Sequence, residues 1–154
     1  NVSNHEAEEF LNAYFSKFPE IKIYMDRTIK FCRKSGYVSN IFGRRSHFIN
    51  INDKNYNVRN FQERAAINAP IQGSAAELMR LAMIRLSKKL NDQQTKMLLQ
   101  IHDELIFEAP KEEVKRVSKI IIDEMSSVAK SEQHSFSIPL TVDLNSGDNW
   151  GTLH

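Results

Sequence analysis

The sequence predicts an α+β protein, in which an antiparallel sheet is packed against helices on one side and is preceded by a pair of helices. Two observations predict this class. Apolar residues recur at helical spacing through several long segments, whereas the shorter apolar runs 96–101 and 105–109 have the length of strands. The elements follow the order helices, hairpin, long helix, hairpin, helix, strand, which is typical of α+β proteins and not of alternating β and α units.

The chain begins with two predicted helices, which cover residues 3–17 and 19–35. In the first, Ser3 and Glu6 have the spacing of a capping box, and apolar residues then recur every three or four positions. In the second, Pro19 suits the first turn and Gly36 suits the position just after the last. Both ends of the helix pair are therefore marked by residues that favour helix termini.

A hairpin is predicted next, with strands at 37–42 and 45–49 and a turn at Gly43 and Arg44. The residues that follow, 50–57, are mostly polar and predict a mobile loop.

A long helical segment is predicted from 58 to 90, because good helix formers dominate it. Pro70 and Gly73 interrupt this pattern, so a kink or a local break is expected between them, and two separate helices remain an alternative. Asn91 and Asp92 predict a turn at its end.

The C-terminal third predicts a second hairpin, a helix and a strand. Three polar residues, 102–104, separate the two apolar runs of the hairpin. Pro110 and the two glutamates that follow it favour the start of a helix. Residues 139–144 predict a last strand, and a turn-rich tail follows.

Composition is that of a globular protein of 154 residues with one cysteine, which favours a reducing compartment. No apolar run approaches 18 residues, so no membrane span is expected. The net charge is only +2, but residues 22–64 carry ten basic and three acidic side chains, a net of +7, which leaves −5 for the rest. This asymmetry points to a polyanionic partner such as nucleic acid, although a solvated charged face would look the same.

The first candidate site is the turn of the second hairpin, His102, Asp103 and Glu104. A tight turn between apolar strands would hold the two carboxylates in a fixed direction. Hard cations such as Mg²⁺ prefer oxygen ligands and keep several waters, so one or two carboxylates plus substrate phosphates suffice to bind them. On these three residues alone, an ordinary polar turn is the more frequent interpretation.

The second candidate site is a row on the long helix, Arg64, Asn68 and Gln72, which are spaced four residues apart. Small residues beside the row leave room for a bulky ligand. Every base pair presents acceptors in the DNA minor groove, which such donors can contact without selecting a sequence. Helix–helix packing with a polar flank explains the same pattern equally well.

Taken together, four stretches of the chain resemble the A family of DNA polymerases, the bacterial members especially. These stretches are Glu63–Glu77, Gln100–Leu105, Gly36–Val38 with Gly43–Arg45, and Ile138–Leu140 with Gly147–Trp150. The matches occur in the same order as in the family, with compatible spacing, and cover essentially the whole chain.

The resemblance implies roles for the candidate residues. Asp103 matches the aspartate that ligates the catalytic Mg²⁺ pair, and Glu104 matches its supporting acidic neighbour. His102 matches a residue near the primer terminus. The row residues match side chains that touch the minor groove at the terminal base pairs; they are Arg64, Asn68 and Gln72. The resemblance also assigns 1–36 to the last helices of the fingers and 37–154 to the C-terminal part of the palm.

Two motifs of the family do not occur in this chain: the strand with the other metal-binding aspartate, and the fingers helix that grips the incoming triphosphate. Both precede this segment in the family. The resemblance therefore implies a C-terminal fragment of a cytoplasmic DNA-directed DNA polymerase, whose partners are primer–template DNA, deoxynucleoside triphosphates and the missing N-terminal part. The isolated fragment is expected to be inactive. A non-catalytic duplex-DNA-binding domain and a structural remnant of a polymerase gene are the alternatives.

Overall fold

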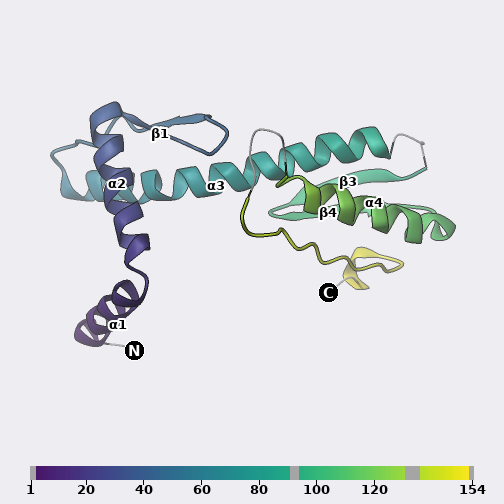
Figure 1. Ribbon diagram of the computed structural model, residues 1–154, viewed down its shortest axis with the longest axis horizontal. Helices are drawn as coiled ribbons and strands as arrows, with labels where there is room; N and C mark the ends of the chain where they lie inside the picture. Colours follow the sequence, from purple (N-terminus) through teal and green to yellow (C-terminus); the bar gives the residue numbers. More distant parts are fainter. Residues whose placement is uncertain (1–2, 91–93, 131–135, 153–154) are drawn as a thin grey trace. The chain divides into compact units, whose positions relative to one another are not determined.

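The computed structural model describes residues 3–90, 94–130 and 136–152, except for the side chain of Asn4. The chain falls into two compact units, Asn1–Ser74 and Ala75–His154, and the boundary lies inside a long helix. Figure 1 labels the four α-helices and the strands β1, β3 and β4. Among the described residues, no helix has the length and apolar character that crossing a membrane requires.

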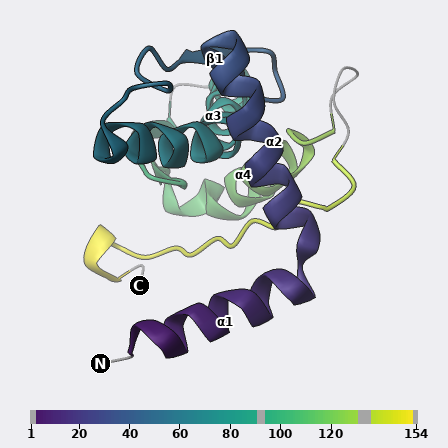
Figure 2. The same ribbon diagram turned by 90° about the vertical axis from the view of Figure 1, so that its left-hand side faces the viewer.

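The predicted helix pair is confirmed as α1 (Asn4–Lys17) and α2 (Pro19–Ser35). The capping box of α1 is complete: the Glu6 amide donates to Ser3 Oγ at 3.2 Å, and the Ser3 amide donates to Glu6 Oε2 at 2.8 Å. The Ser3 amide and the Ser3 hydroxyl both donate to the Glu6 carboxylate, and these two bonds lower the pKa of that carboxyl. Gly36 ends α2 with φ 76°, a conformation that glycine adopts at little cost. Figure 2 shows α1 as an arm joined to α2 at residue 18.

The first hairpin is confirmed, but its strands are shorter than predicted. They are β1 (Tyr37–Ser39) and β2 (Arg45–His47), paired antiparallel with Val38 opposite Ser46. Beyond them the backbone turns because Asn40 Oδ1 accepts hydrogen bonds from the amides of Phe42 at 3.0 Å and Arg44 at 2.9 Å. One buried side chain thus withdraws these two amides from the ladder.

Residues 50–57 were predicted to form a mobile polar loop, but one residue of this loop is packed in the core. Ile51 is only 2% exposed and belongs to the core of this unit, together with Cys32, Val38 and Ala66. The loop also starts the next helix, since Asn55 Oδ1 accepts from the Asn57 amide at 2.9 Å in the manner of an N-cap. One apolar residue among polar neighbours therefore anchors the segment to the core.

The long helix, α3 (Tyr56–Lys89), begins two residues earlier than predicted and contains Pro70 without interruption. The predicted local break, and the alternative of two helices, are wrong. Proline in a helix interior lacks an amide hydrogen and crowds the carbonyl four residues before it, at a cost of about 3 kcal/mol. Contacts from other elements of the same unit offset this cost, as described below.

The second unit is built around a helix end, a hairpin and a helix. Its strands are β3 (Lys96–Ile101) and β4 (Glu104–Glu108), and its helix is α4 (Val114–Ser127), preceded by the 3-10 turn η1 (Lys111–Glu113) and followed near the C-terminus by η2 (Trp150–Thr152). The core joins Leu86 of α3, and Leu90 just after that helix, to Val117 and Ile121 of α4. Full burial of a side chain such as Leu86 contributes roughly 2–3 kcal/mol.

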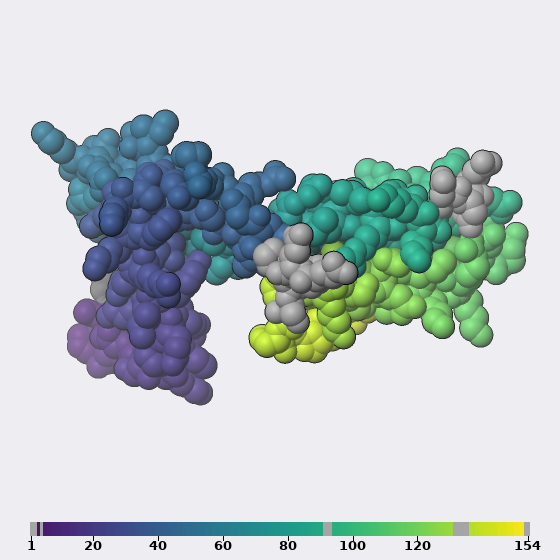
Figure 3. All heavy atoms as spheres, turned by 45° about the horizontal axis from the view of Figure 1, so that its top comes forward, coloured from purple at the N-terminus to yellow at the C-terminus, as the bar shows by residue number. Residues whose placement is uncertain are grey.

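The predicted last strand at 139–144 does not form within the described residues. The segment is extended, with Val142 and Leu144 half-buried between exposed neighbours, and Leu144 packs on the core of this unit. A strand also needs a hydrogen-bonded neighbour, and the described strands pair only as β1–β2 and β3–β4. Both pairs are antiparallel and accompany helices, which confirms the predicted α+β class. In Figure 3, the yellow-green atoms of the C-terminal segment lie against the green atoms of α4. The turn predicted at Asn91 and Asp92 lies outside the described residues.

Candidate functional site

The β3–β4 hairpin closes through a two-residue turn of His102 and Asp103. Ile101 pairs with Glu104 across it. His102 has φ 52° and is the one non-glycine residue with positive φ in the described part of the chain. Positive φ at the first central position alone is the pattern of a type II′ turn, where glycine is usual. The side-chain Nε2 of Gln100 donates to the His102 backbone carbonyl at 3.2 Å and helps to hold the turn.

A histidine in this conformation carries strain of about 1–3 kcal/mol. Such strain persists only where the surrounding structure imposes it, and it concentrates at functional sites. The turn therefore keeps an imidazole where the backbone favours glycine.

Asp103 and Glu104 are both exposed beside this turn. Among the described residues, neither carboxylate takes part in an ion pair or a side-chain hydrogen bond. Both line a cavity of about 500 Å³, whose other walls come from β4, α4 and the extended segment 141–147 and are partly apolar and partly polar. The two carboxylates thus stand free at the edge of an open hollow.

The donor chemistry of this pair fits a hard cation, because carboxylate oxygens are what Mg²⁺ binds. The set is incomplete for an all-protein site, since no three His, Cys, Asp or Glu side chains within the described ranges are grouped to hold an ion. Mg²⁺ keeps several waters and takes further oxygens from phosphates, so a pair of this kind can serve as part of a larger site.

The row on α3 lies in the first unit. Arg64, Asn68 and Gln72 are all exposed, and none of the three is hydrogen-bonded or ion-paired through its side chain to another described residue. Ile71, next to the row, is 61% exposed. Within this unit the row therefore faces outward, with its donors available.

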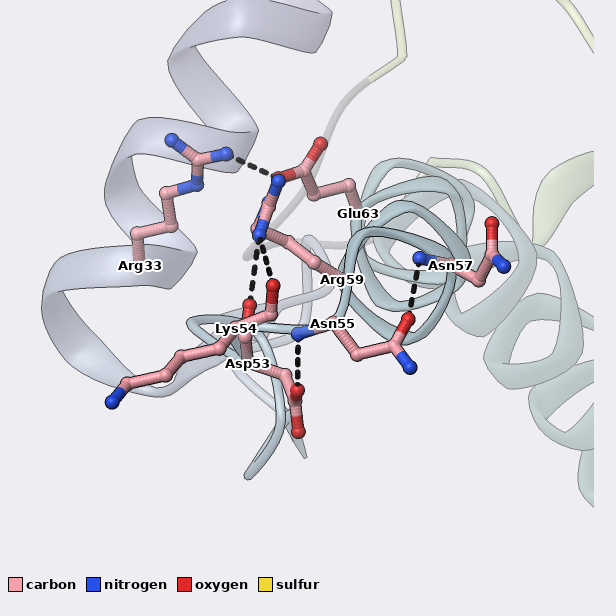
Figure 4. A network of polar contacts seen from close by, with 7 residues as sticks. All are labelled: Arg33, Asp53, Lys54, Asn55, Asn57, Arg59 and Glu63. Atoms are coloured by element: carbon pink, nitrogen blue, oxygen red, sulfur yellow. Dashed lines mark hydrogen bonds and ion pairs between the residues drawn. The ribbon is translucent and has the colours of Figure 1, made fainter.

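The start of α3, just before the row, is fixed by a polar network that the sequence analysis did not single out (Figure 4). Glu63 lies between two guanidinium groups, with Arg33 of α2 in direct contact and Arg59 Nε at 3.9 Å. Arg59 also donates to the carbonyls of Asp53 at 2.9 Å and Lys54 at 3.4 Å. The four-residue spacing of Arg59 and Glu63 was a visible signal for the local pair, whereas the link to Arg33 depends on tertiary structure.

At position 102, glycine should give a more stable purified chain than alanine. We expect His102→Gly to raise the free energy of unfolding by about 1 kcal/mol relative to His102→Ala, because alanine keeps the strain of a positive φ and glycine removes it. Urea denaturation of the two variants measures the difference.

The matched control is Gln100, an exposed residue of β3. There the order should reverse, with Gln100→Gly less stable than Gln100→Ala, because glycine in an ordinary strand conformation loses more entropy on folding. If glycine were the less stable choice at both positions, the turn at His102 would not be strained.

The chain is similar over nearly its whole length to proteins of one family. The sequence model of DNA polymerase family A matches residues 1–152. Relatives named DNA polymerase I include those of Streptococcus pneumoniae, 44% identical over 151 residues, and of Geobacillus stearothermophilus, 42% identical over 152 residues. Each alignment covers 97% of this chain and 17% of the relative, so the chain spans about a sixth of their length.

A solved structure agrees with this similarity. It is the POL domain of Pol1 from M. smegmatis in complex with DNA primer-template and dNTP, which matches with a TM-score of 0.90 at 33% sequence identity. The match covers 99% of this chain and 26% of that chain. Because the family model spans residues 1–152, and the fold agrees with that of a POL domain, the chain belongs to DNA polymerase family A.

Proposed function

We propose that this chain forms the C-terminal part of a DNA-directed DNA polymerase that adds deoxynucleotides to a primer 3′-hydroxyl. The observation that carries the proposal is the free carboxylate pair of Asp103 and Glu104 on the β3–β4 turn, in a chain that belongs to this family. The similar POL domain of M. smegmatis was solved with primer-template and dNTP, which supports these as the substrates. We place the parent enzyme in the cytoplasm, in replication and repair, by its similarity to the bacterial relatives.

Within this proposal, Asp103 is a metal ligand and Glu104 a supporting carboxylate. The exposure of both side chains leaves their oxygens available to metal ions and to metal-bound water. A bound pair of Mg²⁺ ions would neutralise charge that develops on the attacking and leaving oxygens of the transfer. The second metal-binding aspartate would come from an upstream part of the protein.

Arg64, Asn68 and Gln72 would contact the minor groove at the primer terminus, and His102 would lie near the terminal nucleotide. Their free donors match acceptors that every base pair presents there, so contact would not depend on sequence. Holding the 3′-hydroxyl in line matters because a displacement of about 1 Å can cost roughly 10²-fold in rate.

The missing N-terminal part would be a partner within the same polypeptide. Apolar side chains exposed on the first two helices support this, because Phe10 is 72%, Leu11 52% and Ile23 63% exposed. Residues 1–36 would then belong to the fingers and 37–154 to the palm.

Primer extension tests the proposal. The full-length polymerase that contains this chain should extend a primed template, whereas the purified 154 residues should not, because the upstream metal ligand and the triphosphate-binding helix are absent from them. Extension by the 154 residues alone would contradict the division of the active site.

Binding of primer–template by the 154 residues addresses the alternative of a non-catalytic DNA-binding domain. If the full-length protein failed to extend primers while the chain bound duplex in a salt-dependent manner, the alternative would hold instead.

A further inference from the structure

The row on α3 contains a weak point of the helix. Pro70 lies between Asn68 and Gln72, and it has no amide hydrogen for the carbonyl of Ala66. A proline inside a helix usually bends it or loosens it locally. A bend at Pro70 would change how Asn68 and Gln72 are placed relative to one another.

Three hydrogen bonds from other parts of the unit fall on this stretch. Tyr24 Oη of α2 donates to the Ile67 carbonyl at 2.9 Å. Asn40 Nδ2, from the turn that follows β1, donates to the Gly73 carbonyl at 3.1 Å. The Ile41 amide donates to Ser74 Oγ at 3.2 Å. Within the helix, the same Ser74 hydroxyl donates to the Pro70 carbonyl at 2.5 Å.

These contacts and the row occupy opposite sides of the helix. Ala66, Pro70 and Ser74 are spaced four residues apart, as the row is, but are shifted by two positions, which is about 200° around the helix. Ala66 is fully buried and Ser74 is 8% exposed, whereas the row is exposed. One side of α3 is therefore held by α2 and the β1–β2 turn, and the other side is free to meet a ligand.

The two carbonyls that accept hydrogen bonds from Tyr24 and Asn40 belong to residues next to the row in the sequence. Asn68 follows Ile67, and Gln72 precedes Gly73, so the bonds from Tyr24 and Asn40 fix the peptide groups next to them. Asn40 is itself 9% exposed, and it builds its own turn with Oδ1, which leaves Nδ2 directed to α3.

We propose that Tyr24 and Asn40 are positioning residues for the polymerase reaction, which keep α3 helical past Pro70 and so keep Asn68 and Gln72 in register with the primer terminus. The inference rests on the proposed function of the row. Neither residue touches DNA in this role; each acts through a backbone carbonyl beside a row residue.

The test uses Tyr24→Phe in the full-length polymerase, a change that removes one hydroxyl and keeps the ring. The kcat for single-nucleotide extension should fall about 3- to 10-fold, the range that one neutral hydrogen bond can supply, with the KM for the nucleotide within about 2-fold of wild type. The control is Tyr14→Phe on α1, whose hydroxyl has no hydrogen-bond partner among the described residues, and it should leave kcat unchanged.

Coupling to the row separates positioning from general stability. In a background of Asn68→Ala with Gln72→Ala, the change Tyr24→Phe should lower kcat by less than about 2-fold further, because the residues through which it acts are gone. An unchanged kcat for Tyr24→Phe alone, or an equal fall in both backgrounds, would overturn the proposal. If the background variant itself extended primers at the wild-type rate, the proposed function of the row would be wrong and the positioning role would fall with it.

Asn40→Asp gives a second, independent variant. It keeps an oxygen that accepts from Phe42 and Arg44 but replaces the donor to Gly73 by an acceptor, so the turn is kept and the brace is lost. As for Tyr24→Phe, we expect Asn40→Asp to lower kcat when Asn68 and Gln72 are present and to lower it less in the background that lacks both side chains. Additive losses in the two backgrounds would contradict a positioning role for Asn40.

Discussion

Replacing Asp103 by alanine is expected to lower the rate of primer extension by the full-length polymerase at least about 10³-fold. A metal ion that stabilises charge in the transition state contributes several kcal/mol, and each 1.36 kcal/mol corresponds to about tenfold in rate. Primer–template affinity should stay within about 2-fold, because the phosphate backbone, which supplies most of DNA-binding affinity, is met by basic side chains. Single-turnover extension and a separate equilibrium binding measurement give the two quantities.

The matched control for this change is Asp123→Ala, which removes an exposed carboxylate of α4 that is not ion-paired within the described residues. It should leave extension unchanged. The extension rate of Glu104→Ala should lie between those of Asp103→Ala and Asp123→Ala, as expected of a supporting carboxylate. Near wild-type extension by Asp103→Ala would show that the turn is an ordinary polar hairpin and not a metal site.

Replacing Gln72 by alanine is expected to lower the rate of extension by about 10- to 10²-fold with little effect on folding. Its side chain is exposed and has no partner among the described residues, so its removal costs the folded chain almost nothing. Its loss would release the primer terminus, where small displacements are expensive. Extension kinetics and the melting temperature of the same preparation measure both effects.

Gln94→Ala provides the comparison, since Gln94 is likewise exposed but lies outside the row. It should change neither the rate nor the melting temperature. Losses of similar size in stability and in activity for Gln72→Ala would instead favour the reading in which the row packs against another helix.

The elements that local residues specify were predicted well from the sequence. The capping box of Ser3 and Glu6, and the left-handed Gly36 that ends α2, depend on neighbours within four positions. The β3–β4 hairpin also followed from its two apolar runs. Even so, the sequence did not reveal that His102 adopts positive φ, because most histidines, like other residues with a Cβ, have negative φ.

The errors concern contacts between distant residues. Pro70 predicted a break, but Tyr24, 43 residues before Ile67, supplies one of the hydrogen bonds that support the helix there. Ile51 looked like part of a polar loop until its packing on Cys32 placed it in the core. The strand predicted at 139–144 has the required alternation but no partner among the described strands, and alternation alone does not supply one.

The candidate site also has parts that the sequence predicted and parts that depend on contacts between distant residues. Residue types and spacing were enough to select Asp103, Glu104 and the row on α3, and the structure shows that these side chains are exposed and available. Their roles toward metal and DNA stay predictions. The link from Arg33 to Glu63 and the bonds from Asn40 could not be predicted from the sequence, because they join α2, the first hairpin and α3.

The burial of Cys32 gives the first unit a reporter of its own opening. This is the single thiol of the chain, it is 0% exposed, and burial raises its pKa. Only the thiolate attacks labelling reagents, so modification requires that the core around it open. The labelling rate therefore measures how often this core opens under native conditions, without any introduced probe.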